Sequence, residues 1–116
     1  MHPTTQSILP SLGRFTLYTK ALEFGRLALA IPVHGNLRDQ LHRAVESLIL
    51  NIGEGAAQQS LPMKARYWNI ARGSLWETAA ALDILTLKYC ALVERASLES
   101  LIREIDAILA ALTRKR

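Results

Sequence analysis

Apolar residues recur at three- and four-residue spacing along most of this chain, the pattern of helices with one buried face. The clearest case lies between residues 36 and 59, where Asn36 suits the N-cap and Asp39 adds negative charge to the first turn. The stripe predicts a helix that ends near residues 57–59 and buries Leu37, Leu41, Ala44, Val45, Leu48, Ile49, Ile52 and Ala56.

A longer stripe follows, after Ser60 as an expected N-cap and Pro62 in the first turn. It predicts a helix from about Leu61 to Leu92, and its steps alternate between three and four like the seam of a coiled coil. The seam consists of Trp68, Ala71, Leu75, Thr78, Leu82, Leu85, Tyr89 and Leu92. Other faces are also apolar through Ile70, Trp76, Ile84 and Leu87, which predicts burial on several sides.

Two further helices are expected at the ends of the chain. The first runs from about Arg14 to Ala30 and stops at Pro32, after a poorly ordered lead-in at residues 1–13. The last begins at Ser97 as its N-cap and runs to the C-terminus. Its expected core stripe consists of Leu98, Leu101, Ile102, Ile105, Ile108, Leu109 and Leu112.

Four helices with short connections predict an all-α domain, an antiparallel up-and-down four-helix bundle over residues 14–116. The apolar content, 50% of 116 residues, exceeds what one such interior needs. Leu50, Trp76 and Leu87 fall outside the best stripes. They indicate self-association through helix faces, with scattered surface apolar residues as the alternative.

Composition narrows the function classes. A single Cys90 excludes an internal disulfide framework, and no uncharged apolar run of membrane-spanning length occurs, so a cytoplasmic protein with no membrane association is expected. The net charge is +4, and the first 75 residues hold eight Lys or Arg against four Asp or Glu. This surplus could attract nucleic acid or another polyanion, although an ordinary basic surface would look the same.

Catalytic patterns are weak. The three histidines do not pair at metal-ligand spacing, and no phosphate-binding glycine loop is present. No metal, cofactor or enzymatic activity is therefore expected. A hydrolytic pair made of Glu54 and Glu77 is the least favoured reading, because no partner that activates water can be named.

A polar set on two otherwise apolar helices is more informative. Arg43, Ser47, Asn51 and Glu54 share one face of the second helix, and Ser74 and Glu77 share one face of the third beside Arg72 and Gly73. Such residues could pair across the helices, for example Arg43 with Glu77 or Glu54 with Arg72. We interpret Arg43, Asn51, Glu54, Gly73, Ser74 and Glu77 as a structural polar network, with a ligand or nucleic-acid contact as the alternative. Gly73, inside a helix, suggests close approach of another helix.

Basic residues supply the candidate nucleic-acid contacts. Residues 55–76 lack acids and interleave Lys64, Arg66 and Arg72 with Tyr67 and Trp68, a mixture suited to phosphate contact and base stacking. Trp68 fits the core seam better, so Lys64 and Arg66 are expected to be the exposed cations. The complete candidate set is Arg14, Lys20, Lys64, Arg66, Arg72, Arg114, Lys115 and Arg116.

Two runs, QLHRAVESLILNIGEGAAQQS and YWNIARGSLWETAAALDIL, carry a family resemblance. Three short motifs in these runs resemble those of the 23S rRNA intervening-sequence proteins. They consist of Gln40, Arg43 and Ala44; of Asn51, Ile52, Glu54 and Gly55; and of Ala71, Gly73, Ser74 and Glu77. That family includes the accessory variability proteins of diversity-generating retroelements, and the resemblance covers about residues 15–112. Gly53 stands where the family usually has Ala, and Ala56-Ala57-Gln58-Gln59 lacks the basic residue often found after Glu-Gly.

The resemblance implies a four-helix bundle that assembles into a homo-oligomeric ring, typically a pentamer. In retroelement members the basic ring binds RNA or DNA and a reverse transcriptase. Two hypotheses therefore stay open: a nucleic-acid-binding accessory module, and a homo-oligomeric scaffold that binds a protein partner and no nucleic acid.

Overall fold

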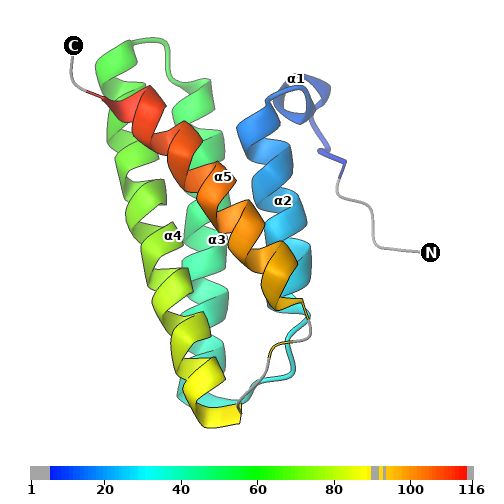
Figure 1. Ribbon diagram of the computed structural model, residues 1–116. Coiled ribbons are helices and arrows are strands. Elements are labelled where there is room, and N and C mark those ends of the chain that lie inside the picture. The colour runs from blue at the N-terminus through cyan, green and yellow to red at the C-terminus, as the bar shows by residue number, and fades with distance from the viewer. Residues whose placement is uncertain (1–5, 90–91, 93, 115–116) are drawn as a thin grey trace.

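The computed structural model describes residues 6–89, 92 and 94–114 (Figure 1). Within them the chain forms five helices and no strand, which confirms the all-α class. The helices are α1 (Pro10–Gly13), α2 (Thr16–Leu29), α3 (Gly35–Ala57), α4 (Leu61–Tyr89) and α5 (Arg95–Thr113). The four predicted helices correspond to α2 through α5, and α1 is additional.

The four long helices alternate in direction, and their arrangement brings distant parts of the chain together (Figure 1). Helix α3 packs between α2 and α4, while α5 crosses obliquely and contacts both α4 and α2. The start of α2, the end of α3, the start of α4 and the end of α5 therefore lie at the same end of the molecule. The five-membered ring concerns several copies of the chain and stays a prediction.

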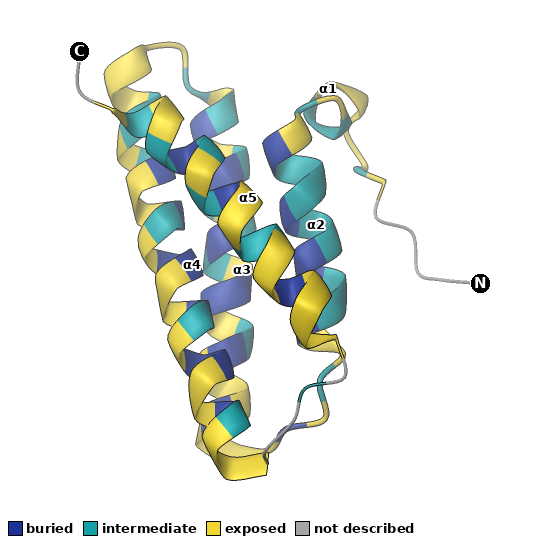
Figure 2. Cartoon of the chain, in the orientation of Figure 1, coloured by how far each residue is buried: buried dark blue, intermediate teal, exposed yellow. Residues whose placement is uncertain are grey.

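The core confirms the predicted stripes of the two central helices. Leu41, Val45, Leu48 and Ile52 of α3 are fully buried, as are Ala71 and Leu75 of α4. Figure 2 shows the buried positions of α3 and α4 on their inward sides. Phe24 and Leu17 of α2 and Ile105 and Leu109 of α5 complete one hydrophobic cluster, so all four long helices share a single core.

Helix ends are less well predicted than helix faces. The Ser60 hydroxyl accepts a hydrogen bond from the Met63 N–H at 3.3 Å, which confirms Ser60 as the cap of α4. Helix α3 begins at Gly35, whose left-handed φ of 71° turns the chain one residue before the expected cap Asn36. Ser97 lies inside α5 and does not cap it, because α5 already begins at Arg95.

The expected lead-in at residues 1–13 contains structure. Pro10 occupies the first turn of α1, where its missing N–H is tolerated. Leu12 of this helix borders a shallow pocket with Tyr18 of α2 and Gly53 of α3. Residues 1–5 lie outside the described part of the chain.

The outward side of α4 differs from the prediction of burial on several sides. Ile70, Trp76, Ile84 and Leu87 are all exposed, Trp76 to 63% and Leu87 to 83%. The seam also ends early: Tyr89 is 62% exposed, and Leu92 lies beyond the end of α4. The reason is that α4 packs mainly against α3 and α5 and faces the core with one side, which leaves its other side open. No helix of the described residues is long and apolar enough to cross a membrane.

Candidate nucleic-acid interface

Four of the candidate cations lie toward the end of the molecule where α2 and α4 begin and α5 ends. Arg14 joins α1 to α2, Lys64 and Arg66 lie in the first two turns of α4, and Arg114 follows α5. The Phe15 and Trp68 rings, 5.9 Å apart, tie the start of α2 to α4, and Arg114 lines a pocket with Leu61 and Ala65. We refer to Arg14, Lys64, Arg66 and Arg114 as the basic end. Lys115 and Arg116 lie outside the described residues.

Lys64 has a structural role at this end and is not the freely exposed cation that was expected. Its Nζ donates to the carbonyl oxygens of Ala56 at 3.0 Å and Gly55 at 3.4 Å. The last carbonyls of a helix lack intrahelical partners, so a lysine there stabilises the end of α3. The ammonium also lies 5.7 Å from the centre of the Trp68 ring. Lys64 is consequently half-buried.

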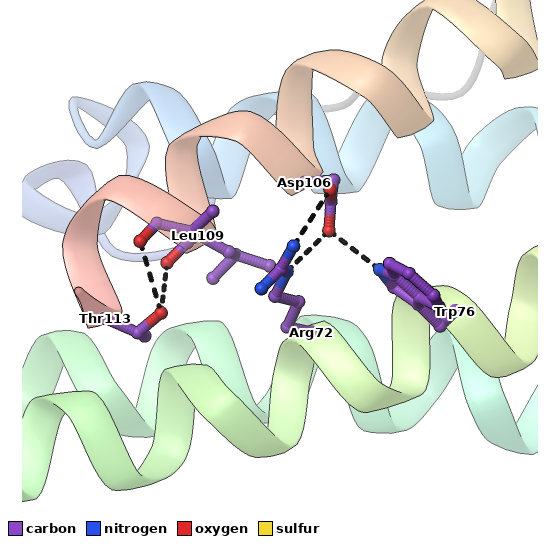
Figure 3. A network of polar contacts seen from close by, with 6 residues as sticks. Arg72, Trp76, Asp106, Leu109 and Thr113 are labelled. Atoms are coloured by element: carbon purple, nitrogen blue, oxygen red, sulfur yellow. Dashed lines mark hydrogen bonds and ion pairs between the residues drawn. The ribbon is translucent and has the colours of Figure 1, made fainter. Parts of the chain in front are cut away.

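Arg72 is engaged within the chain by α5 (Figure 3). Its Nε and Nη2 donate to the two carboxylate oxygens of Asp106, at 2.7 and 3.3 Å. The Trp76 indole N–H donates to the same carboxylate at 2.9 Å, and the guanidinium lies over the Trp76 ring, 5.7 Å from its centre. The pairing with Glu54 suggested by the sequence is therefore wrong.

Electrostatics reinforces this contact between α4 and α5. The hydrogen bond from Arg72 lowers the pKa of Asp106, and the bond from Trp76 acts in the same direction against partial desolvation. The same hydrogen bond raises the pKa of Arg72. The arginine and the aspartate thus stabilise each other's charged form and hold the two helices in register.

The remaining candidate cations differ in availability. Lys20 of α2 is paired with Glu104 of α5 at 3.4 Å. Arg14, Arg66 and Arg114 are exposed, and none of the three forms an ion pair with a described residue. These three guanidinium groups are the ones that a polyanion could reach without breaking a contact in the chain.

Of the residues grouped as a polar network, Asn51 and Ser74 form side-chain hydrogen bonds with Ser47. Ser47 of α3 and Ser74 of α4 share a hydrogen bond of 2.7 Å, and the Asn51 amide donates to the Ser47 hydroxyl at 3.1 Å and to its carbonyl at 2.8 Å. The small serine side chains let α3 and α4 approach closely, and the hydrogen bond between them satisfies both hydroxyl groups. Arg43 and Glu77 are both exposed, and no ion pair joins them among the described residues.

The two motif glycines have different surroundings. A Cβ added to Gly55 would lie only 2.4 Å from the Trp68 Nε1 and 2.6 Å from its Cδ1, so the ring occupies the space that a side chain would need. The Trp68 indole N–H donates to the Ile52 carbonyl at 3.2 Å, which fixes the ring there. A Cβ added to Gly73 would meet nothing within 4 Å. Close approach within the chain therefore explains Gly55 and does not explain Gly73.

Two other features bear on chemistry. Glu54 borders the shallow pocket near Tyr18, and Glu77 is exposed on α4. The described residues contain no group of three or more His, Cys, Asp or Glu able to hold a metal ion. Asp106 is the partner of Arg72 that sequence reasoning missed, because 34 residues separate the two and no local pattern links them.

Comparison with known proteins gives one match. The family model described as 23S rRNA-intervening sequence protein matches residues 26–114, which is most of the chain: the last turn of α2 and the whole of α3, α4 and α5. No curated protein and no solved structure matches the chain.

Proposed function

Because this chain belongs to the 23S rRNA-intervening sequence protein family, we propose that it is a nucleic-acid-binding accessory module, a four-helix bundle that acts through its basic end without catalysing a reaction. The observation that carries the proposal is the exposure of Arg14, Arg66 and Arg114 near one end of the molecule, without ion-pair partners among the described residues.

The physical basis is counterion release. A phosphate backbone binds cations mainly by releasing its condensed counterions, which needs several accessible Lys or Arg on one surface and no particular base sequence. The structure leaves few aromatic rings for base stacking at the basic end, because Trp68 is buried and its N–H is bonded to Ile52. The proposed binding therefore has weak sequence preference.

The test is the salt dependence of binding to a structured RNA and to single-stranded DNA, measured by fluorescence anisotropy. The affinity should fall as salt rises. The double variant R14A/R114A should flatten the log–log slope by about 2, because each removed guanidinium leaves about one phosphate without its cation.

The control is R38A/K88A, which removes two exposed cations from the start of α3 and the end of α4, at the opposite end of the molecule. Arg38 lies 3.6 Å from Asp39, and Lys88 has no ion pair with a described residue. This control should leave the salt slope unchanged. Equal weakening by the two double variants would contradict a localised interface. Absence of any binding at low salt would leave the scaffold hypothesis, which the exposed apolar side of α4 favours.

A further inference from the structure

Trp76 of α4 presents a large aromatic surface that is exposed and yet fixed in orientation (Figure 3). The residue is 63% exposed, while its indole N–H donates to the Asp106 carboxylate of α5 at 2.9 Å. The Arg72 guanidinium binds the same carboxylate and lies 5.7 Å from the centre of the Trp76 ring. An exposed side chain without such contacts would lose rotational freedom when a ligand bound, which weakens binding. The Trp76 ring is already ordered by the chain itself.

The surface beside this ring is open. Side chains of a helix lean toward its N-terminus, so the Trp76 ring lies over the turn that holds Arg72 and Gly73. Arg72 occupies its part of this turn, but a Cβ added to Gly73 would meet nothing within 4 Å. A flat group could therefore lie against the ring without displacing a side chain at position 73.

Trp76 lies on the line along which α5 meets α4, which we call the α4–α5 junction. Toward the basic end, Asn69 of α4 lines a hollow together with Arg114. In the other direction, Ala79 of α4 lines a second hollow together with Arg103 of α5. Asn69, Trp76 and Ala79 share one face of α4, because positions seven and three residues apart lie on the same side of a helix. The ring thus stands between two hollows of the same junction.

Cations stand on both sides of the ring along this junction. Arg114 and Arg103 are exposed, and neither forms an ion pair with a described residue. The intervening carboxylate of Asp106 is neutralised by Arg72. Asp83 lines the hollow beyond Arg103 and has no ion pair with a described residue, so the cationic stretch ends there. A short negatively charged chain could follow the junction from Arg114 to Arg103.

We propose that a single-stranded nucleic acid follows the α4–α5 junction, with one unpaired base stacked on Trp76 and its backbone phosphates near Arg114 and Arg103. Base stacking on an aromatic ring beside cations that contact phosphate is the general way in which single strands are bound. The inference rests on the nucleic-acid binding proposed above and adds a preference for unpaired bases. Every base has a flat face, so this preference does not require a particular sequence.

The chemistry around the ring favours a single strand over the other occupants. The bases of a duplex are already stacked on one another, so only unpaired bases can reach the ring. The core of a protein interface would need apolar neighbours, whereas Asn69, Arg72 and Ala79 surround Trp76 on its face of α4. Glu77 would repel phosphate, but it points about 100° away from Trp76 around the helix.

The deciding experiment compares a short oligothymidine with an abasic strand of the same length, which keeps every phosphate and has no bases. Fluorescence anisotropy at fixed low salt measures both affinities. The wild type should bind oligothymidine about tenfold more tightly, as expected for one stacked base. W76A should lose this difference and bind the two strands equally, because the phosphate contacts remain.

The control variants separate the ring from its surroundings. W76F keeps an aromatic ring and should keep most of the preference for oligothymidine. Y89A removes an aromatic side chain of almost the same exposure, 62%, from the far end of α4 and should behave as the wild type. R103A should flatten the salt slope for oligothymidine by about 1, whereas K88A should leave it unchanged. Circular dichroism of each variant verifies that the helices are retained.

Tryptophan fluorescence gives a direct readout of stacking. Oligothymidine should quench the emission of the wild type, and the abasic strand should not. W76F retains only the buried Trp68 and should show no quenching.

Three results would overturn the inference. Equal affinity of the wild type for the two strands would exclude stacking and leave the role of the basic end intact. Absence of binding to either strand would remove the proposed function and this inference with it. A change in the number of associated copies of W76A by analytical ultracentrifugation, with both strand affinities unchanged, would assign Trp76 to a protein contact.

Discussion

Helix α4 has two faces with the same spacing of side chains and opposite surroundings. The core seam, represented by Ala71 and Leu75, is closed off by α2, α3 and α5 in one hydrophobic cluster. The outward face, represented by Ile84 and Leu87, is open. Periodicity identifies a face that is able to pack, but only a neighbouring element buries it, so the outward face has the pattern of an interior without the partner.

The two motif glycines repeat this difference on a smaller scale. Gly55 of α3 is required by the fold of the single chain, because the Trp68 ring lies where its side chain would be. Gly73 of α4 faces open space. A motif glycine can therefore be required by the core of the chain or lie on its surface, and the sequence pattern looks alike in both cases.

The largest expected effect comes from truncating matched aliphatic side chains on the two faces of α4. Leu75→Ala should lower the free energy of unfolding by about 2–5 kcal/mol, since Leu75 is fully buried and a cavity would remain. Ile84→Ala, at a position 42% exposed, should cost less than about 1 kcal/mol. Urea unfolding at a protein concentration that keeps the chain monomeric measures both. Equal decreases would show that the two faces are not different in the single chain.

The glycines should respond with opposite signs. Gly55→Ala should destabilise the chain by about 1–3 kcal/mol, because the Trp68 ring would have to move out of a packed site. Gly73→Ala should stabilise the monomer by up to about 1 kcal/mol through helix propensity alone. Thermal unfolding followed by circular dichroism gives both values. A lower stability of Gly73→Ala would point to a contact inside the chain and remove the contrast.

A smaller effect is expected from the charged contact that joins α4 to α5. Asp106→Asn should lower the free energy of unfolding by about 1 kcal/mol, as for a partly exposed ion pair with charge-assisted hydrogen bonds. The folded-state pKa of Asp106 lies below its ordinary value of about 3.9, so the carboxylate stabilises the fold above that value.

The stability contributed by the Asp106 carboxylate depends on pH. This stabilisation is lost as the pH falls below about 4 and through the lower folded pKa of Asp106. Unfolding free energies measured between neutral and acidic pH should therefore drop less steeply for Asp106→Asn than for the wild type. The control Asp83→Asn removes an exposed carboxylate that has no ion pair with a described residue, and it should keep the wild-type slope.

Local patterns account for most of what could be predicted. The stripe from Leu37 to Ile52 and the seam from Trp68 to Leu85 are buried as expected, and Ser60 caps α4. The end of α4 and the start of α5 were misplaced, because residues such as Ser97 that favour a cap also occur inside helices. The sequence identified the basic residues. It could not show which of them lack partners within the chain, because those partners are carbonyl and carboxylate oxygens of other helices.

By itself, the sequence determined the helical class, the inward faces of the helices and the family motifs, because these depend on residues three or four positions apart. Only the tertiary structure decided that Lys64 caps α3, that Arg72 binds Asp106, and that Arg14, Arg66 and Arg114 are free of ion pairs with the described residues. It also showed that Gly55 accommodates Trp68 while Gly73 faces open space. The physical reason is that ion pairs and close packing join residues from different helices, and sequence spacing carries no record of such contacts.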